Sequence, residues 1–171
     1  MPFLFLVFIA IQAAQPPGLL RGRSFQIMAP HGWTVHEAGA DAIFEHATGA
    51  SLRVVRSRQP QKIDSFARDA VERVMRPLGF AKLGEPRRFQ DSDQEWVQYE
   101  IRGNRLSDRR RILYRAIRRH NALFEVVYEN NEDRFDFLLT EAQSMASSVL
   151  QSLEENEGAA QFRNRAVRRG R

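Results

Sequence analysis

The sequence predicts an α+β fold in which an antiparallel β-sheet of about six or more strands is sandwiched by helices, an α/β/α arrangement. Two observations predict it. Several short segments alternate apolar and polar residues with the two-residue period of strands, and they follow one another across short turns, which indicates antiparallel pairing. Two longer segments repeat apolar residues every three or four positions, so each is a helix with one face to bury against the sheet.

The first 15 residues are expected to lie outside this domain. An unbroken apolar run over 3–11 is followed by small residues and then by Gln15 to Gly18, as in the h-region and cleavage site of a secretory signal peptide. The run is shorter than the about 20 apolar residues that span a bilayer. No Lys or Arg precedes it, so an uncleaved N-terminal membrane anchor is the alternative. We therefore expect an exported protein, periplasmic or secreted, with a linker over 16–22.

Length and composition predict one globular domain without thiol chemistry. The 171 residues, 43% of them hydrophobic, suffice for a single domain over 23–153 with its own core. There is no cysteine, which excludes disulfides, cysteine-zinc sites and a thiol nucleophile. Residues 154–171 contain five of the arginines and little apolar periodicity, so they are predicted to be a disordered basic tail.

The first third of the domain is expected to form antiparallel hairpins. Its first strand alternates apolar and polar residues and stops at Pro30-His31-Gly32-Trp33, a sequence typical of a turn. Two short strands and one firmer strand follow across further glycine-containing turns. The expected strands are residues 24–29, 34–37, 42–45 and 51–57.

A helix, a strand meander and a long closing helix are expected next. The first helix opens near Asp64, carries an apolar stripe from Ile63 to Met75 and stops at Pro77 and Gly79. The apolar residues from Phe135 to Leu153 recur at helical spacing, which predicts one amphipathic helix over the sheet. The strands expected between the two helices are residues 81–83, 87–89, 94–102, 110–118 and 123–129.

A family resemblance emerges from the order of these motifs. A first strand enters Pro30-His31-Gly32-Trp33, a helix carries Phe66, a meander ends in the strand at 124–128, and the last helix closes on 146–150. The chain from 24 to 153 resembles the PsbP-like superfamily, which includes the extrinsic photosystem II protein and exported bacterial proteins such as DcrB. The resemblance implies a docking or accessory module and not an enzyme, and no functional residue is carried over from it.

The densest charge cluster runs from Arg102 to Arg119, where eight arginines are accompanied by a single acid, Asp108. The whole chain carries a net charge of +5. Such a cluster is typical of a surface that binds an acidic protein, an anionic lipid surface or nucleic acid. The expected export argues against nucleic acid and leaves an envelope protein or an anionic lipid surface as the predicted partner. The alternative interpretation is a solvated strand neutralised by its neighbours.

The predicted hairpin around His120 and Asn121 assigns acidic neighbours to part of this cluster. Residues whose numbers sum to about 240 would lie opposite one another, which places Arg115 beside Glu125 and Arg111 beside Glu129. Five other arginines gather at strand ends without an evident acidic neighbour. The candidate partner-binding residues are therefore Arg105, Arg109, Arg110, Arg118 and Arg119.

Metal, cofactor and catalytic motifs are not recognisable. His36 and His46 would flank a predicted hairpin and are weak metal candidates, but without ligand spacing the interpretation as surface histidines is favoured. No nucleophile elbow, phosphate loop or carboxylate pair is found, so we predict no cofactor and no enzyme activity. The predicted function is a non-catalytic docking module. The alternative is a small-ligand or metal carrier with an apolar cavity between the sheet and the C-terminal helix.

Overall fold

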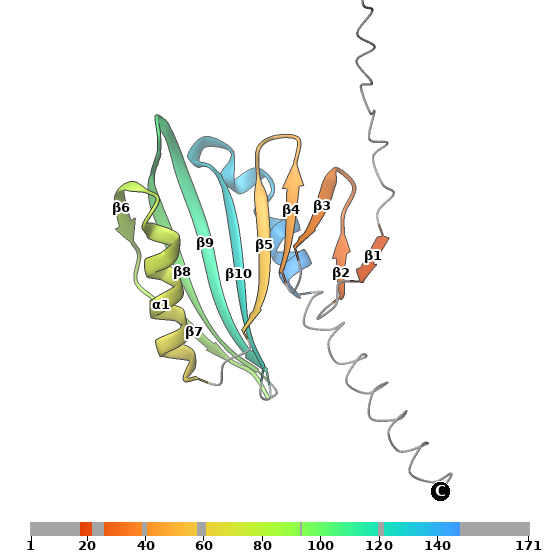
Figure 1. Cartoon of the computed structure of the whole chain (residues 1–171), viewed down its shortest axis with the longest axis vertical. Coiled ribbons are helices and arrows are strands. Elements are labelled where there is room, and N and C mark those ends of the chain that lie inside the picture. The colour runs from red at the N-terminus through yellow and green to blue at the C-terminus, as the bar shows by residue number, and fades with distance from the viewer. Residues whose placement is uncertain are drawn as a thin grey trace, which may run out of the picture.

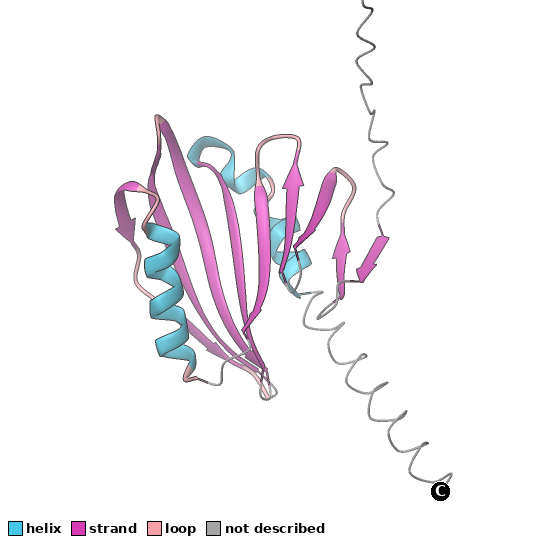
Figure 2. Ribbon diagram, in the orientation of Figure 1, coloured by secondary structure: helices cyan, strands magenta, loops and turns pink. Residues whose placement is uncertain are grey.

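A twisted antiparallel sheet with helices on both faces forms the centre of the computed structural model (Figure 1). The structure describes residues 18–21, 26–38, 41–57, 61–92, 94–119 and 122–147. The signal segment expected at 1–15 and the basic tail expected at 154–171 lie outside the described residues. Figure 2 shows helices on opposite faces of the strands, so the predicted α/β/α sandwich is confirmed.

The main sheet contains eight strands in the described residues. Their order is β3-β4-β5-β10-β9-β8-β6, and β7 pairs with the same edge of β8 as β6. Strands β1 and β2 form a separate two-stranded sheet, so the linker expected over 16–22 contains a strand. The strands are β1 (Gly18–Arg21), β2 (Gln26–Ala29), β3 (Trp33–Ala38), β4 (Asp41–His46), β5 (Ser51–Ser57), β6 (Gly79–Leu83), β7 (Arg87–Gln90), β8 (Gln94–Arg105), β9 (Asp108–Arg119) and β10 (Ala122–Asn131).

The helix on one face of the sheet is found as predicted, whereas the helical segment on the other face differs from the prediction. Helix α1 (Ile63–Met75) buries its apolar stripe as predicted. The predicted long helix begins instead as a 3-10 helix, η1 (Glu132–Phe137), followed by α-helical residues from 139 to 147; its predicted end at 148–153 lies outside the described residues. Side chains of β10 explain the difference, because the Tyr128 hydroxyl and the Asn130 amide donate to the carbonyls of Phe135 and Arg134 at 2.8 and 3.0 Å. These two bonds satisfy carbonyls of the 3-10 segment and hold its first turn against β10.

Two hydrophobic cores lie on opposite faces of the sheet, and β10 contributes to both. Phe124, Val126 and Tyr128 pack under the C-terminal helical segment, whereas Leu123 and Val127 pack towards α1. Under the C-terminal helix the cavity measures only about 10 Å³, room for about one water molecule. Between the sheet and the described part of this helix, the cavity is therefore too small for the ligand of the carrier alternative.

One carboxylate is buried between the sheet and α1. Glu125 on β10 is 2% exposed. Its two oxygens accept hydrogen bonds from Nη2 of Arg53 on β5, at 2.6 Å, and from Nη2 of Arg73 on α1, at 2.9 Å. This triad of Arg53, Arg73 and Glu125 ties the central strand to its neighbour and to the helix.

The predicted pairing of Arg115 with Glu125 is therefore wrong. The last pair of the β9–β10 hairpin is Arg119 with Ala122, so paired residues sum to 241 and Glu125 lies opposite Ala116. A shift of one residue moves every side chain of a strand to the other face of the sheet. Arg115 consequently lies on the face away from Glu125.

Replacing Glu125 with Gln is expected to lower the free energy of unfolding by about 1.5–3 kcal/mol, the value of hydrogen bonds to a charged group. The loss stays below that of a fully buried ion pair because the Arg53 and Arg73 side chains are 40% and 53% exposed and can be hydrated. Urea unfolding at neutral pH measures it. The control Glu72→Gln, on the exposed face of α1, should stay within about 0.5 kcal/mol of the native chain. Equal losses for both variants would contradict the role of the triad.

Candidate functional site

The five candidate arginines lie at two opposite ends of the sheet. Arg105, Arg109 and Arg110 surround the turn between β8 and β9, and Arg118 and Arg119 lie at the far end of β9. Arg109 and Arg118 are nine positions apart, which corresponds to about 30 Å along an extended strand. The single basic patch suggested by the sequence is therefore divided into two groups.

Near the turn, one acid neutralises two of these arginines. Nη2 of Arg105 lies 3.2 Å from Glu129, and Nε of Arg110 lies 3.5 Å from the same carboxylate. Arg110 also donates from Nη1 to Oδ1 of Asn131 at 2.6 Å. The side chain of Arg109 is exposed and makes no hydrogen bond or ion pair with a described residue. Glu129 thus serves Arg105 and Arg110 in place of the predicted partner Arg111.

At the far end of β9 the remaining two arginines are held by the fold. Arg118 forms an ion pair with Glu95 at 2.8 Å and donates from Nη2 to the carbonyl of Gln61, also at 2.8 Å. Arg119 is buried, with 8% of its surface exposed. These geometries give both residues a role in the sheet itself.

Arg111 belongs to a network on the face of the C-terminal helix. Its Nε and Nη2 donate to the two oxygens of Glu100 at 2.9 and 3.1 Å, and its guanidinium lies 4.4 Å from the ring centre of Phe135. Arg102 donates to the same carboxylate at 2.9 and 3.0 Å. The hydrogen bond from Arg111, followed by that from Arg102, holds the pKa of Glu100 below its ordinary value despite partial burial.

Two bulky apolar residues stand out at the end of the sheet near Arg109. Leu106 is 99% exposed with φ +57°, and Phe80 is 90% exposed with φ +51°. Leu106 begins the two-residue turn between Arg105 and Asp108, which we call the hairpin tip (residues 105–108). Positive φ at the first turn position alone is the pattern of a type II′ turn, where glycine is preferred.

Phe80 reaches the same end of the sheet through an irregularity in β6. Gly79 pairs with Asn104 and Lys82 with Arg102, and the register shifts between these pairs. Asn104 lies two residues before Leu106, so the strand register brings the two exposed apolar residues to one end. A hollow of about 460 Å³ lies beside the hairpin tip, bordered by Ser107, Asp108, Arg109, Asn131, Glu132 and Asp133.

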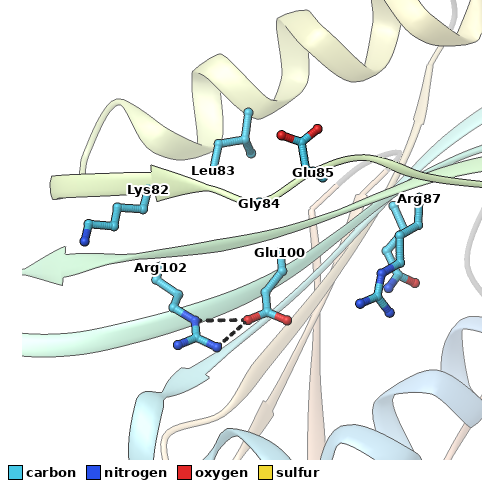
Figure 3. A pocket seen from close by; sticks show the side chains of 8 residues that line it. Lys82, Leu83, Gly84, Glu85, Arg87, Glu100 and Arg102 are labelled. Atoms are coloured by element: carbon cyan, nitrogen blue, oxygen red, sulfur yellow. Dashed lines mark hydrogen bonds and ion pairs between the residues drawn. The ribbon is translucent and has the colours of Figure 1, made fainter.

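A groove of about 400 Å³ follows the sheet edge where β6 gives way to β7 (Figure 3). Gly84 allows the connection to lie close to β8, because its N–H donates to the carbonyl of Glu100 at 2.8 Å and a Cβ there would lie 3.1 Å from that oxygen. The lining residues are Lys82, Leu83, Gly84, Glu85, Arg87, Gln98, Glu100 and Arg102.

The two weak metal candidates point to opposite faces of the sheet. His36 lies opposite Ile43, and its Nε2 is 3.4 Å from Glu45. His46 lies opposite Trp33, on the face of the aromatic core, and its Nδ1 is 2.9 Å from the Thr48 hydroxyl. Their imidazoles cannot converge on one ion. Among the described residues no group of three or more His, Asp or Glu side chains is placed to hold a metal, and no helix there is long and apolar enough to cross a bilayer.

Replacing Glu100 with Gln is expected to lower the free energy of unfolding by about 1 kcal/mol at pH 7, the upper range for solvent-screened pairs. Because the folded state lowers the pKa of Glu100, its contribution is present above the ordinary value of 4.5 and is lost as the pH falls below it. The difference between native chain and variant should therefore shrink towards pH 3 in urea unfolding. A difference that stays constant from pH 7 to pH 3 would contradict the assignment.

The sequence matches no protein-family model and no curated protein. Its structure is similar to that of cyanobacterial PsbP (CyanoP) from Synechocystis sp. PCC 6803, with TM-score 0.60, 17% identity, and coverage of 81% of this chain and 94% of that one. A protein of unknown function from Pseudomonas aeruginosa is similar with TM-score 0.52 and 14% identity, over 76% of this chain and 95% of that one. The Ran-binding protein Mog1p of Saccharomyces cerevisiae is similar with TM-score 0.51 and 10% identity, over 84% of this chain and 94% of that one. At such identities the likeness concerns the fold. The chain therefore has the PsbP-like fold that its motifs predict.

Proposed function

We propose that this chain is a non-catalytic docking module that binds a protein partner through one end of its sheet. The docking end consists of Phe80 and residues 105–109. One observation carries the proposal: two bulky apolar residues, Phe80 and Leu106, are almost fully exposed and both adopt left-handed backbone conformations. Each such conformation costs about 1–3 kcal/mol for a residue other than glycine. Neither side chain is packed in the core, and glycine would suit both backbone conformations better, so we infer a use for them outside the fold.

The chemistry of the docking end suits a protein surface. Aromatic residues and arginine are enriched in protein interfaces, and a large exposed apolar side chain gains free energy when a partner covers it. Here Leu106 and Phe80 supply apolar anchors, Arg109 supplies a guanidinium without a described partner, and the hollow beside the tip could receive a partner's side chain. The similar yeast protein Mog1p is a Ran-binding protein, so this fold is compatible with protein recognition.

Local charge favours a protein over an anionic lipid surface. Of the three arginines near the tip, Arg105 and Arg110 are neutralised by Glu129, and acids of the tip and of η1 lie beside Arg109. Binding to anionic lipid depends on several basic residues acting together near the surface. We accordingly retain Arg105, Arg109 and Arg110 as neighbours of the proposed interface and leave Arg118 and Arg119 out of it.

We propose that the protein works in the cell envelope or outside the cell. The apolar run at 3–11 and the small residues after it support export to the periplasm or secretion, with membrane tethering by an uncleaved segment as the alternative. The partner proposed is accordingly an envelope protein.

Site-specific photocrosslinking in intact cells tests the docking end. A photoreactive amino acid replaces Leu106, Phe80 or, as control, Asp69 on the exposed face of α1. We expect positions 106 and 80 to crosslink to the same protein and position 69 to give no such adduct. Adducts to lipid alone, or equal adducts from all three positions, would contradict the proposal.

A further inference from the structure

We infer that the groove between β8 and the β6–β7 edge binds an extended acidic segment of the docked partner, with two carboxylate side chains spaced four residues apart. The inference rests on the proposed function, since it adds the chemistry of the partner to the docking end. Lys82 in the groove comes two residues after Phe80, so the groove continues directly from the docking end.

The groove presents its cations on one face of the sheet. Lys82 is paired in register with Arg102, and Arg87 with Gln98, so these four side chains share a face. Figure 3 shows Leu83 and Glu85 pointing to the other side, towards α1. On the shared face Glu100 is the one lining carboxylate, and it already accepts hydrogen bonds from Arg102 and Arg111.

Two of these cations are available to a ligand. The side chains of Lys82 and Arg87 are exposed and form no hydrogen bond or ion pair with a described residue. Beside Arg87, the Gln98 Oε1 accepts a hydrogen bond from Nε of Arg115 at 2.7 Å, which leaves the N–H groups of the Gln98 amide as donors. The Arg87 end of the groove therefore offers a guanidinium and an amide to a carboxylate.

Strand geometry sets the spacing of the two carboxylates. Arg102 and Gln98 are four residues apart on β8, which corresponds to about 13 Å. In an extended peptide, residues i and i+4 are separated by the same distance and point to the same side. One carboxylate would meet Lys82 and the other Arg87, whereas an acid at i+2 would face Glu100, whose guanidinium partners are already engaged.

The shape of the groove favours a peptide over an enclosed small molecule. Small-ligand sites bury most of the ligand surface in a cleft. Here the lining side chains of β6 and β7 are exposed along the sheet edge, so a small anion would remain largely solvated. An extended segment instead gains contacts along the whole groove, as in strand-edge recognition.

Fluorescence anisotropy with the full chain and labelled decapeptides tests the inference. The probes have a serine and threonine background with glutamates at i and i+4, with glutamates at i and i+3, or with both replaced by glutamine. We expect the i, i+4 peptide to bind about two- to fivefold more tightly than the i, i+3 peptide, whose acids point to opposite sides. Equal affinities for the two acidic peptides would overturn the inference, because they would indicate attraction by net charge only.

Variants locate the site. Arg87→Gln and Lys82→Gln should each weaken binding of the i, i+4 peptide by about two- to fivefold, while Arg68→Gln, which removes the same charge from the exposed face of α1, should leave it unchanged. An equal effect of Arg68→Gln would overturn the inference. Competition by inorganic phosphate or glutarate at the same concentration as the peptide would overturn it too, in favour of a small-anion site. These titrations use synthetic peptides, so their outcome is independent of the crosslinks from Leu106 and Phe80.

Discussion

The buried carboxylate of Glu125 is the interaction on which the arrangement of the sheet edge depends. A charge at 2% exposure is tolerated only with close partners, and the guanidiniums of Arg53 and Arg73 supply one for each oxygen. Arg73 lies in the last turn of α1 and fixes the end of the helix over the sheet. From there the chain passes through buried Leu78 directly into β6. The triad thus fixes the end of α1 from which the chain enters β6, and pairing of β6 with β8 places Phe80 and the groove.

Local sequence patterns were sufficient for most of the elements. Strand β5 is found at the predicted residues, and α1 follows its apolar stripe, because periodicity reports which face of a segment is buried. Two features escaped this reasoning. The start of the closing helix is held by hydrogen bonds from Tyr128 and Asn130, and β8 continues to Arg105, past the predicted end of this strand at residue 102. Both depend on neighbours that periodicity does not describe.

The candidate site was less accessible to sequence reasoning, because charge pairing depends on register. The register of β9 and β10 differs by one residue from the expected one, so the expected Arg–Glu pairs do not form. Glu129 instead forms ion pairs with Arg105 and Arg110. Charge counting identified five arginines without an evident acidic neighbour, and of these only the side chain of Arg109 lacks a described partner in the structure. The clearest sequence signal for the docking end is the absence of glycine at the first turn position of the hairpin tip, where Leu106 is found instead. Departures from local rules of this kind are expected at functional sites.

The central claim is that the side chains of Phe80 and Leu106 serve binding and not folding. The most direct measurement is the free energy of unfolding, by urea denaturation, of the double variant Phe80→Gly and Leu106→Gly. Relief of two left-handed conformations, about 1–3 kcal/mol each, should offset the greater chain entropy of glycine, about 0.5–1 kcal/mol each. The account predicts a variant at least as stable as the native chain. A loss of more than about 1 kcal/mol would contradict it, because the two side chains would then be part of the fold.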